Sequence, residues 1–368
     1  MENVIINRSQ KTINWNQIYS LMGLNAAIVI SWIAYHNYQP KVLELFNFQE
    51  LALFLVVAQA IILVVIPPVA GLIGDYFIKA KGNRLIVFTV GISVTAMTFM
   101  AVAFTLKTAD TINLIPFLPY MIIVWLISMN IFNSPANSML ELFAPAKELP
   151  IAMAMLTMTT ELLYALEPVV VWFVDTIGPV LTFVTGGVLI IVSGYFFNKT
   201  TKNITLNREY EEVKSSRSNI ALVLIVALVL GLATAILMNK FPSLLASKLQ
   251  IMNSEVLGGA HYVSIILAIS ALAAWPLSIW ISKFGLVFSI TLGTVSTFIF
   301  IGAVYLVSEP VSTIICCLFL AISYSILSVS AFPFALSNLS KKNVTFGAGL
   351  FFGFLELADG LMNIWGAL

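Results

Sequence analysis

Long, nearly unbroken runs of apolar residues follow one another along the whole chain, separated by short polar segments. A helix that crosses a bilayer needs about 20 predominantly apolar residues, and runs of this length recur throughout the sequence. We expect spans near residues 17–38, 49–73, 84–106, 113–140, 150–174, 179–198, 219–246, 256–282, 285–307, 311–337 and 345–367. The pattern predicts an all-α polytopic membrane protein with about eleven transmembrane helices.

One polar stretch, residues 199–218, is longer and more charged than the others. Its charged residues are Lys199, Lys202, Arg208, Glu209, Glu211, Glu212, Lys214 and Arg217. Such a composition is typical of a solvated linker. We therefore predict an N-terminal bundle of six helices over residues 1–198, a cytoplasmic linker over 199–218, and a C-terminal bundle of about five helices over 219–368.

Composition agrees with a membrane protein and excludes several other classes. Hydrophobic residues make up 60% of the chain and charged residues 10%, whereas soluble domains are usually about 25% charged. A net charge of +1 gives no reason to expect a nucleic-acid partner. Cys316 and Cys317 are adjacent, and neither His36 nor His261 has further metal ligands nearby in sequence. Because HExxH, GxSxG and P-loop motifs are also missing, we expect no enzyme, no metal site and no cofactor.

Lys and Arg residues concentrate in segments that would share one side of the membrane. If the N-terminus is internal, the inner segments hold fourteen of the eighteen cations, as the positive-inside rule requires. They are Arg8, Lys11, Lys79, Lys81, Arg84, Lys147, Lys199, Lys202, Arg208, Lys214, Arg217, Lys283, Lys341 and Lys342. The polar residues 1–11 lack the apolar core of a signal peptide. The prediction is an integral protein of the cell's inner (plasma) membrane with a cytoplasmic N-terminus.

A compact charged segment follows the second predicted span. It contains Gly71, Gly74, Asp75, Gly82 and Arg84, together with Lys79 and Lys81. An acid at the membrane edge can interact with the positive N-terminal end of a neighbouring helix, while the cations hold the inner face. We therefore expect this segment to tie two helices together at the cytoplasmic side.

Six spans, a charged linker and a second set of spans, together with this segment, resemble the major facilitator superfamily. The interval from Asp75 to Gly82 is longer than in the usual family signature and is similar to the sucrose-transporter-like and glycoside/pentoside/hexuronide symporter branches. A second match is 134–153, which looks like the family's junction between the fourth and fifth spans. The resemblance implies two helical bundles of the major facilitator type, alternating access, and a cytoplasmic gating role for the segment around Asp75.

Three features depart from the family pattern. Glu167-Pro168 stands where many members carry a Gly-Pro pair, so antiport gains no support. The corresponding segment of the second half, 282–285, lacks the acid. The family normally has twelve spans and eleven are counted here, so we expect either a shortened protein or two spans merged in the count.

Acids inside spans are the main chemical signal, because a charged side chain at the centre of a bilayer costs about 3 kcal/mol or more. Glu161 and Glu167 lie in the fifth predicted span with Tyr164 between them, three residues from each. Glu356 and Asp359 lie one helical turn apart in the last span. All four acids are proton-coupling candidates. The alternatives are a neutral glutamic acid that bonds structurally to a neighbouring helix and, for Asp359, a solvated helix end.

Other polar and aromatic residues are candidates for a solute pathway. Asn25, Trp32 and His36 share one face of the first span, and Asn130 belongs to a polar stripe on the fourth. Tyr164 and Lys240 complete the set of candidates. Aromatic residues also anchor spans at the interface, amides also bond between helices, and Lys240 can extend to the outer interface instead.

These observations predict a secondary active transporter whose two bundles rock about a central cavity. The spans hold acids but no arginine, which favours a neutral or cationic solute, and the branch resemblance favours a sugar. We expect proton symport, with sodium as the other possible coupling ion, and a monomer whose partners are the small-molecule substrate and the lipid bilayer. The alternative is a non-transporting membrane sensor or scaffold with a shortened transporter fold.

Overall fold

The computed structural model describes residues 12–109, 111, 114–204, 218–249 and 258–367, and within them every regular element is helical. The α-helices are α1 (Trp15–Leu45), α2 (Ala52–Lys81), α3 (Leu85–Lys107), α4 (Leu118–Asn137), α5 (Leu140–Phe143), α6 (Leu149–Ala165), α7 (Glu167–Thr201), α8 (Ile220–Asn239), α9 (Phe241–Lys248), α10 (Gly259–Phe284), α11 (Leu286–Leu306), α12 (Pro310–Ser337) and α13 (Val344–Ala367). Short 3-10 turns are η1 (Gln49–Leu51), η2 (Ile115–Phe117) and η5 (Lys341–Asn343).

Ten helices of the described part are long and apolar enough to cross a membrane, and α6 is a shorter apolar helix. The element α7 contains a break at Gly178, where φ is 80° and ψ is 168°. This backbone conformation strongly favours glycine, and the following Pro179 restarts the helix. The break separates the predicted fifth and sixth spans, so the prediction of an all-α protein with about eleven spans is confirmed.

Several predicted boundaries are wrong in detail. The second predicted span ends at residue 73, but α2 continues to Lys81 and is closed by Gly82 in the left-handed conformation, with φ of 76°. Hydropathy falls at the membrane edge, whereas the helix ends only where glycine permits the turn. The predicted span 219–246 is divided into α8 and α9 at Lys240, because Pro242 occupies the first turn of a new helix.

Parts of two other predictions lie outside the described residues. They are residues 1–11 at the polar start, and residues 205–217 of the linker, which include Arg208, Glu209, Glu211, Glu212, Lys214 and Arg217. Before residues 205–217, α7 ends at Thr201, and after them α8 begins at Ile220. The predicted bundle boundaries therefore stay a prediction.

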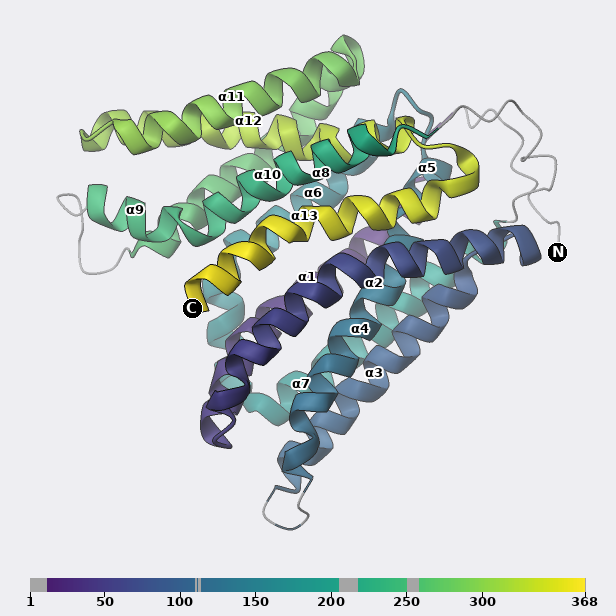
Figure 1. Cartoon of the computed structure of the whole chain (residues 1–368). Coiled ribbons are helices and arrows are strands. Elements are labelled where there is room, and N and C mark those ends of the chain that lie inside the picture. Colours follow the sequence, from purple (N-terminus) through teal and green to yellow (C-terminus); the bar gives the residue numbers. More distant parts are fainter. Residues whose placement is uncertain (1–11, 110, 112–113, 205–217, 250–257, 368) are drawn as a thin grey trace.

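The long helices form two groups (Figure 1). The helices α1, α2, α3, α4 and α7 lie together in the lower part of the view, and α8, α10, α11, α12 and α13 lie together in the upper part. Across the boundary, α2 packs along α13, and α6 packs both against α1 and against α10 and α12. The groups converge near the N-terminal end of α1 and diverge towards the opposite end.

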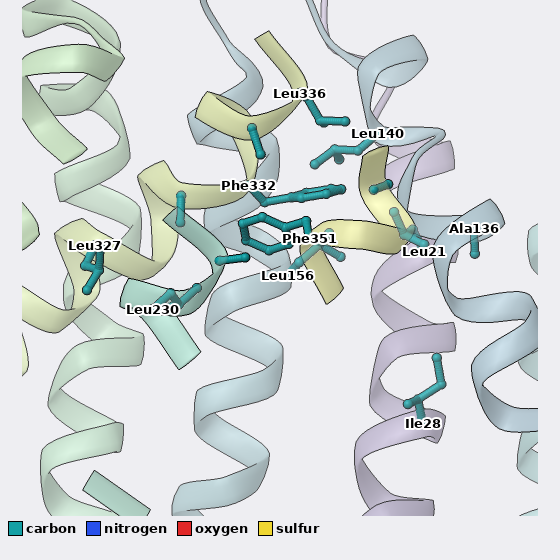
Figure 2. Packing of buried hydrophobic residues seen from close by; sticks show 14 of the residues in the cluster. Leu21, Ile28, Ala136, Leu140, Leu156, Leu230, Leu327, Phe332, Leu336 and Phe351 are labelled. Atoms are coloured by element: carbon teal, nitrogen blue, oxygen red, sulfur yellow. The ribbon is translucent and has the colours of Figure 1, made fainter. Parts of the chain in front are cut away.

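Buried apolar side chains fill the region where the groups converge. Figure 2 shows Phe332 of α12 and Phe351 of α13 together there, with Leu156 of α6 close by. The two rings lie 5.1 Å apart. Many large apolar side chains elsewhere point outward, among them Trp172 at 67% exposure and Leu272 at 68%. Such surfaces are unfavourable in water but match a lipid environment.

Candidate functional site

The two helix groups are joined by Asp75, which lies near the end of α2 and is 6% exposed. Its carboxylate oxygens accept hydrogen bonds from the backbone N–H groups of Thr345, at 3.1 Å, and Phe346, at 2.9 Å. These residues form the first turn of α13, whose N–H groups have no partner within the helix. The acid is therefore bonded to the positive end of a helix from the other group, as the sequence predicted.

A second link is made by Arg84, which precedes α3 and is 2% exposed. Its Nη1 atom donates to Ser138 Oγ at 2.8 Å and to Thr345 Oγ1 at 2.7 Å. Its Nη2 atom lies 3.8 Å from Glu141 Oε1. One guanidinium at the start of α3 thus joins this helix both to the segment around α5 and to the start of α13. We call Asp75, Arg84, Ser138, Glu141 and Thr345 the clasp, and the end of the molecule that contains them the clasp end.

Gly71 and Gly74 allow α2 to approach α13 at the clasp. A Cβ atom on Gly71 would lie 2.7 Å from the Cα atom of Phe346, and one on Gly74 would lie 2.8 Å from Thr345 Cγ2. Distances below 3.0 Å require a neighbour to move. The residues of the segment predicted from sequence are thus brought together, with Gly82 ending α2. Their gating role stays a prediction.

Glu161 of α6 lies where α6 meets α10 and α12, and it is 5% exposed. Ser328 of α12 donates its hydroxyl to Glu161 Oε1 at 2.8 Å. The hydroxyl of Ser270, on α10, also interacts with this carboxyl group. In the described part of the chain, however, Glu161 Oε2 and Ser270 Oγ complete no hydrogen bond of normal geometry. Two of the three polar groups at this site are therefore left with an unused bonding position.

Further from the clasp, a second polar group is shared between α6 and α13. Tyr164 of α6 interacts electrostatically with Glu356 and Asp359 of α13, and with Glu167 at the start of α7. All four side chains are half-buried. One acid from α7 and two acids from α13 therefore interact with a single phenol on α6.

Glu356 and Asp359 have different surroundings, although they lie one turn apart. Asp359 Oδ1 accepts from the Asn239 amide at 2.7 Å, and Oδ2 accepts from the Asn363 amide at 2.8 Å. Asp359 also interacts with His36 of α1, across the boundary between the groups. Asp359 is therefore held in position by hydrogen bonds from two other residues.

An aromatic cluster adjoins this polar group on the α1 side. Trp32 lies 5.6 Å from His36 and 5.1 Å from Trp125, measured between ring centroids. Tyr35 stacks on Trp125 at 4.6 Å and donates its hydroxyl to Gln59 Oε1 at 3.0 Å. Trp32 is half-buried and His36 is exposed. The cluster can therefore offer both a stacking surface and a polar edge to a solute.

Three predicted pathway residues take other positions. Asn25 donates to Thr160 Oγ1 at 2.6 Å, which bonds α1 to α6. Asn130 is 4% exposed and donates to the Leu126 carbonyl of its own helix at 2.8 Å. Lys240 is exposed at the junction of α8 and α9. The structure therefore does not bring these three together with Tyr164, Glu356 and Asp359.

Several residues of the site were missed by the sequence reasoning. They are Ser270 and Ser328 beside Glu161, Asn239 and Asn363 beside Asp359, and Tyr324, whose phenol lies 2.8 Å from Thr234 Oγ1. A serine or threonine inside an apolar span is common and gives little signal by itself. The asparagines lie near span ends, where amides are also frequent.

This architecture defines a polytopic integral membrane transporter, with two helix groups joined at one end and acids and aromatic rings gathered between them. Family comparison gives the same result: the Major Facilitator Superfamily profile matches residues 16–361. The chain belongs to this superfamily, and the predicted family and the absence of an enzymatic role are confirmed. A comparison with curated protein sequences gave no significant match.

Solved structures of superfamily transporters share the fold at low sequence identity. The human organic anion transporter MFSD10 (TETRAN) is 9% identical, with a TM-score of 0.68 over 95% of this chain and 93% of that one. The proton:xylose symporter XylE is 11% identical, with a TM-score of 0.68 over 96% and 89%. A bacterial homologue of the iron transporter ferroportin, in an outward-facing state, is 11% identical, with a TM-score of 0.66 over 95% and 91%.

Proposed function

We propose that this transporter moves a small neutral or cationic solute by alternating access, driven by proton symport. The observation that carries the proposal is the polar group of Tyr164, Glu356, Asp359 and His36, which is shared between the two helix groups. A site built from both groups changes its exposure when they rock against each other. Acids at the same place provide groups that can bind a proton together with a solute.

The charge of this group favours neutral or cationic solutes over anions. Its acids are Glu167, Glu356 and Asp359, and His36 is the side chain of the group that can become cationic. Trp32 and Tyr164 offer rings on which a sugar or an organic cation can stack. The likeness to a proton:xylose symporter supports a sugar, whereas the likeness to an organic anion transporter does not fit the acidic site.

The moving units in this proposal are the bundles 1–198 and 219–368, joined by a linker over 199–218. The clasp end faces the cytoplasm of a cell whose inner (plasma) membrane holds the protein, since most cations of the short segments lie there. In this orientation the N-terminus is internal, and the conformation is closed towards the cytoplasm by Asp75 and Arg84. The transporter acts as a monomer.

A solute screen in reconstituted vesicles tests the proposal. The purified protein is placed in liposomes that contain a pH-sensitive dye, and sugars, amines and peptides are added one class at a time. Acidification of the interior by one class, lost in Glu356→Gln, is the expected result. Glu44→Gln is the matched control, because Glu44 is an exposed acid at the end of α1. Silence across the library, with folding confirmed, would favour a sensor or scaffold instead.

A further inference from the structure

Glu161 occupies a position that the solute site does not explain. It lies in the contact between α6, which also packs against α1, and the pair α10 and α12. Ser270 and Ser328, the polar residues that meet it there, belong to the second group. Glu161 is on α6, which directly precedes α7 in the chain and packs against α1 of the first group. All three are nearly inaccessible to solvent: Glu161 is 5% exposed, Ser270 0% and Ser328 7%. Any change in this contact therefore changes the environment of the carboxyl group.

The bonding pattern around Glu161 is incomplete in a specific way. Ser328 satisfies Oε1, but Oε2 and Ser270 Oγ remain without a partner although Ser270 interacts with the carboxyl group. Glu161 interacts with Ser328, Ser270 and Tyr324, which are not basic. On α12, the titratable side chain that interacts with Glu161 is Tyr324. On α1, the polar side chain of Asn25 donates to Thr160, the residue before Glu161. An ionised carboxylate here would be buried without a counter-charge, which is strongly unfavourable.

We propose that Glu161, Ser270 and Ser328 form a proton-binding site that bridges the two helix groups and holds the clasp end closed when the proton is bound. The proton resides on Glu161 Oε2, which donates to Ser270 Oγ, while Ser328 donates to Oε1. Ser270 can in turn donate to a backbone carbonyl one turn earlier in α10, as serine hydroxyls in helices commonly do. One proton thereby completes the bonding of both unused groups.

Loss of the proton has the opposite effect. The carboxylate then needs water or a cation, and water can reach it only if α6 separates from α10 and α12. The same separation acts on the clasp, because the clasp lies in the contact between α2 and α13, the other large contact that joins the groups. Proton release therefore favours opening of the clasp end. The inference rests on the proposed function for its place in a transport cycle, but the site itself exists in the absence of solute.

A bound sodium ion is a less suitable occupant of this site. The ion favours several oxygen ligands around it, whereas Ser328 Oγ already donates to Glu161 Oε1 at hydrogen-bonding distance, 2.8 Å. Ser325, which lies one helical turn before Ser328 on α12, donates its hydroxyl to the Ser270 carbonyl at 2.8 Å and so already has a hydrogen-bond partner. A proton supplies the donor that Glu161 Oε2 and Ser270 Oγ lack, and it leaves the bonds of Ser328 and Ser325 in place.

The test measures the distance between the two groups at the clasp end as a function of pH. Cys316 and Cys317 are replaced by alanine, and spin labels are attached at Lys79→Cys and Lys342→Cys, two exposed positions on opposite groups. The distance between the two spin labels is measured by double electron–electron resonance, with the protein in lipid nanodiscs without solute. We expect short distances at acidic pH and a growing population of long distances as the pH rises.

Variants separate this site from other titrating groups. Glu161→Gln keeps a neutral side chain at every pH and is expected to lose the shift and stay closed. Ser270→Ala removes the acceptor of the proton, so a more acidic pH is needed to reach the same closed fraction. The matched control Glu44→Gln should behave as the unmodified protein.

A pH-independent distance in the unmodified protein, or an unchanged shift in Glu161→Gln, would overturn the proposal. A shift to short distances when sodium is added at constant pH would also overturn the proposal and would identify a cation site instead. Because no solute is present, these results do not depend on whether the solute screen succeeds. A chain that transports nothing can still show the pH-dependent distance, and a proton symporter can fail to show it.

Discussion

Arg84 and Thr345 are 261 residues apart in sequence, yet the guanidinium of one donates to the hydroxyl of the other at 2.7 Å. Both side chains are buried, at 2% and 0% exposure. The bond joins the start of α3 to the start of α13 and so links the two helix groups. The contribution of this bond to the clasp can be tested directly by mutation, because replacing threonine with valine removes the hydroxyl with almost no change in shape.

Thr345→Val is expected to weaken the clasp by about 1–3 kcal/mol, since a buried cation then loses one of its acceptors. The readout is thermal unfolding of the purified protein in detergent. Thr176→Val is the control, because Thr176 makes an exposed bond within its own helix. Equal unfolding temperatures for the two variants would show that the Arg84–Thr345 bond does not stabilise the closed end.

Gly74→Ala is expected to push α2 away from α13, because the added methyl group would meet the Thr345 side chain at 2.8 Å. Faster modification of a cysteine placed at Lys342 by a water-soluble maleimide, compared with the parent protein, reports the separation. Gly23→Ala is the matched control, since a Cβ atom there has no neighbour within 4 Å. If both variants label at the parent rate, the close helix approach does not control access at the clasp end.

Asp359→Asn is expected to reduce solute-driven proton uptake by about tenfold or more, since a charge-assisted contact contributes about 1.5–3 kcal/mol. The amides of Asn239 and Asn363 hold this carboxylate in place and would remain in the variant. Asp175→Asn is the control. Asp175 pairs with Lys41 at 2.7 Å on the exposed surface, where such pairs contribute about 1 kcal/mol or less. Equal loss in both variants would indicate a general effect of charge removal.

The spans could be predicted from sequence because the bilayer imposes a length and a composition on each helix. Acids inside these spans are rare for the same reason, so Glu161 and Glu356 were found without a structure. Two residues of the clasp, Asp75 and Arg84, were found because they interrupt an apolar region and resemble a known family segment. In each of these cases the signal lies within a single short stretch of sequence.

The partners of these residues could not be predicted, because they come from distant parts of the chain. Ser328 lies 167 residues from Glu161, and Asn239 lies 120 residues from Asp359. Nothing in the local pattern of α12 or α8 distinguishes these polar residues from those that bond within their own helix. Asn130 shows the reverse case, since a polar stripe on α4 indicated a pathway but its amide bonds to its own backbone.

The most direct test of proton-coupled transport is accumulation of the solute against its own gradient. Liposomes that contain the protein are given an inward proton gradient, and the internal concentration of the solute identified by the screen is followed over time. We expect the solute to accumulate above its external concentration, and to stop doing so when an ionophore removes the gradient or when Glu356 is replaced by Gln. Entry that only reaches equal concentrations, with or without the gradient, would contradict proton symport.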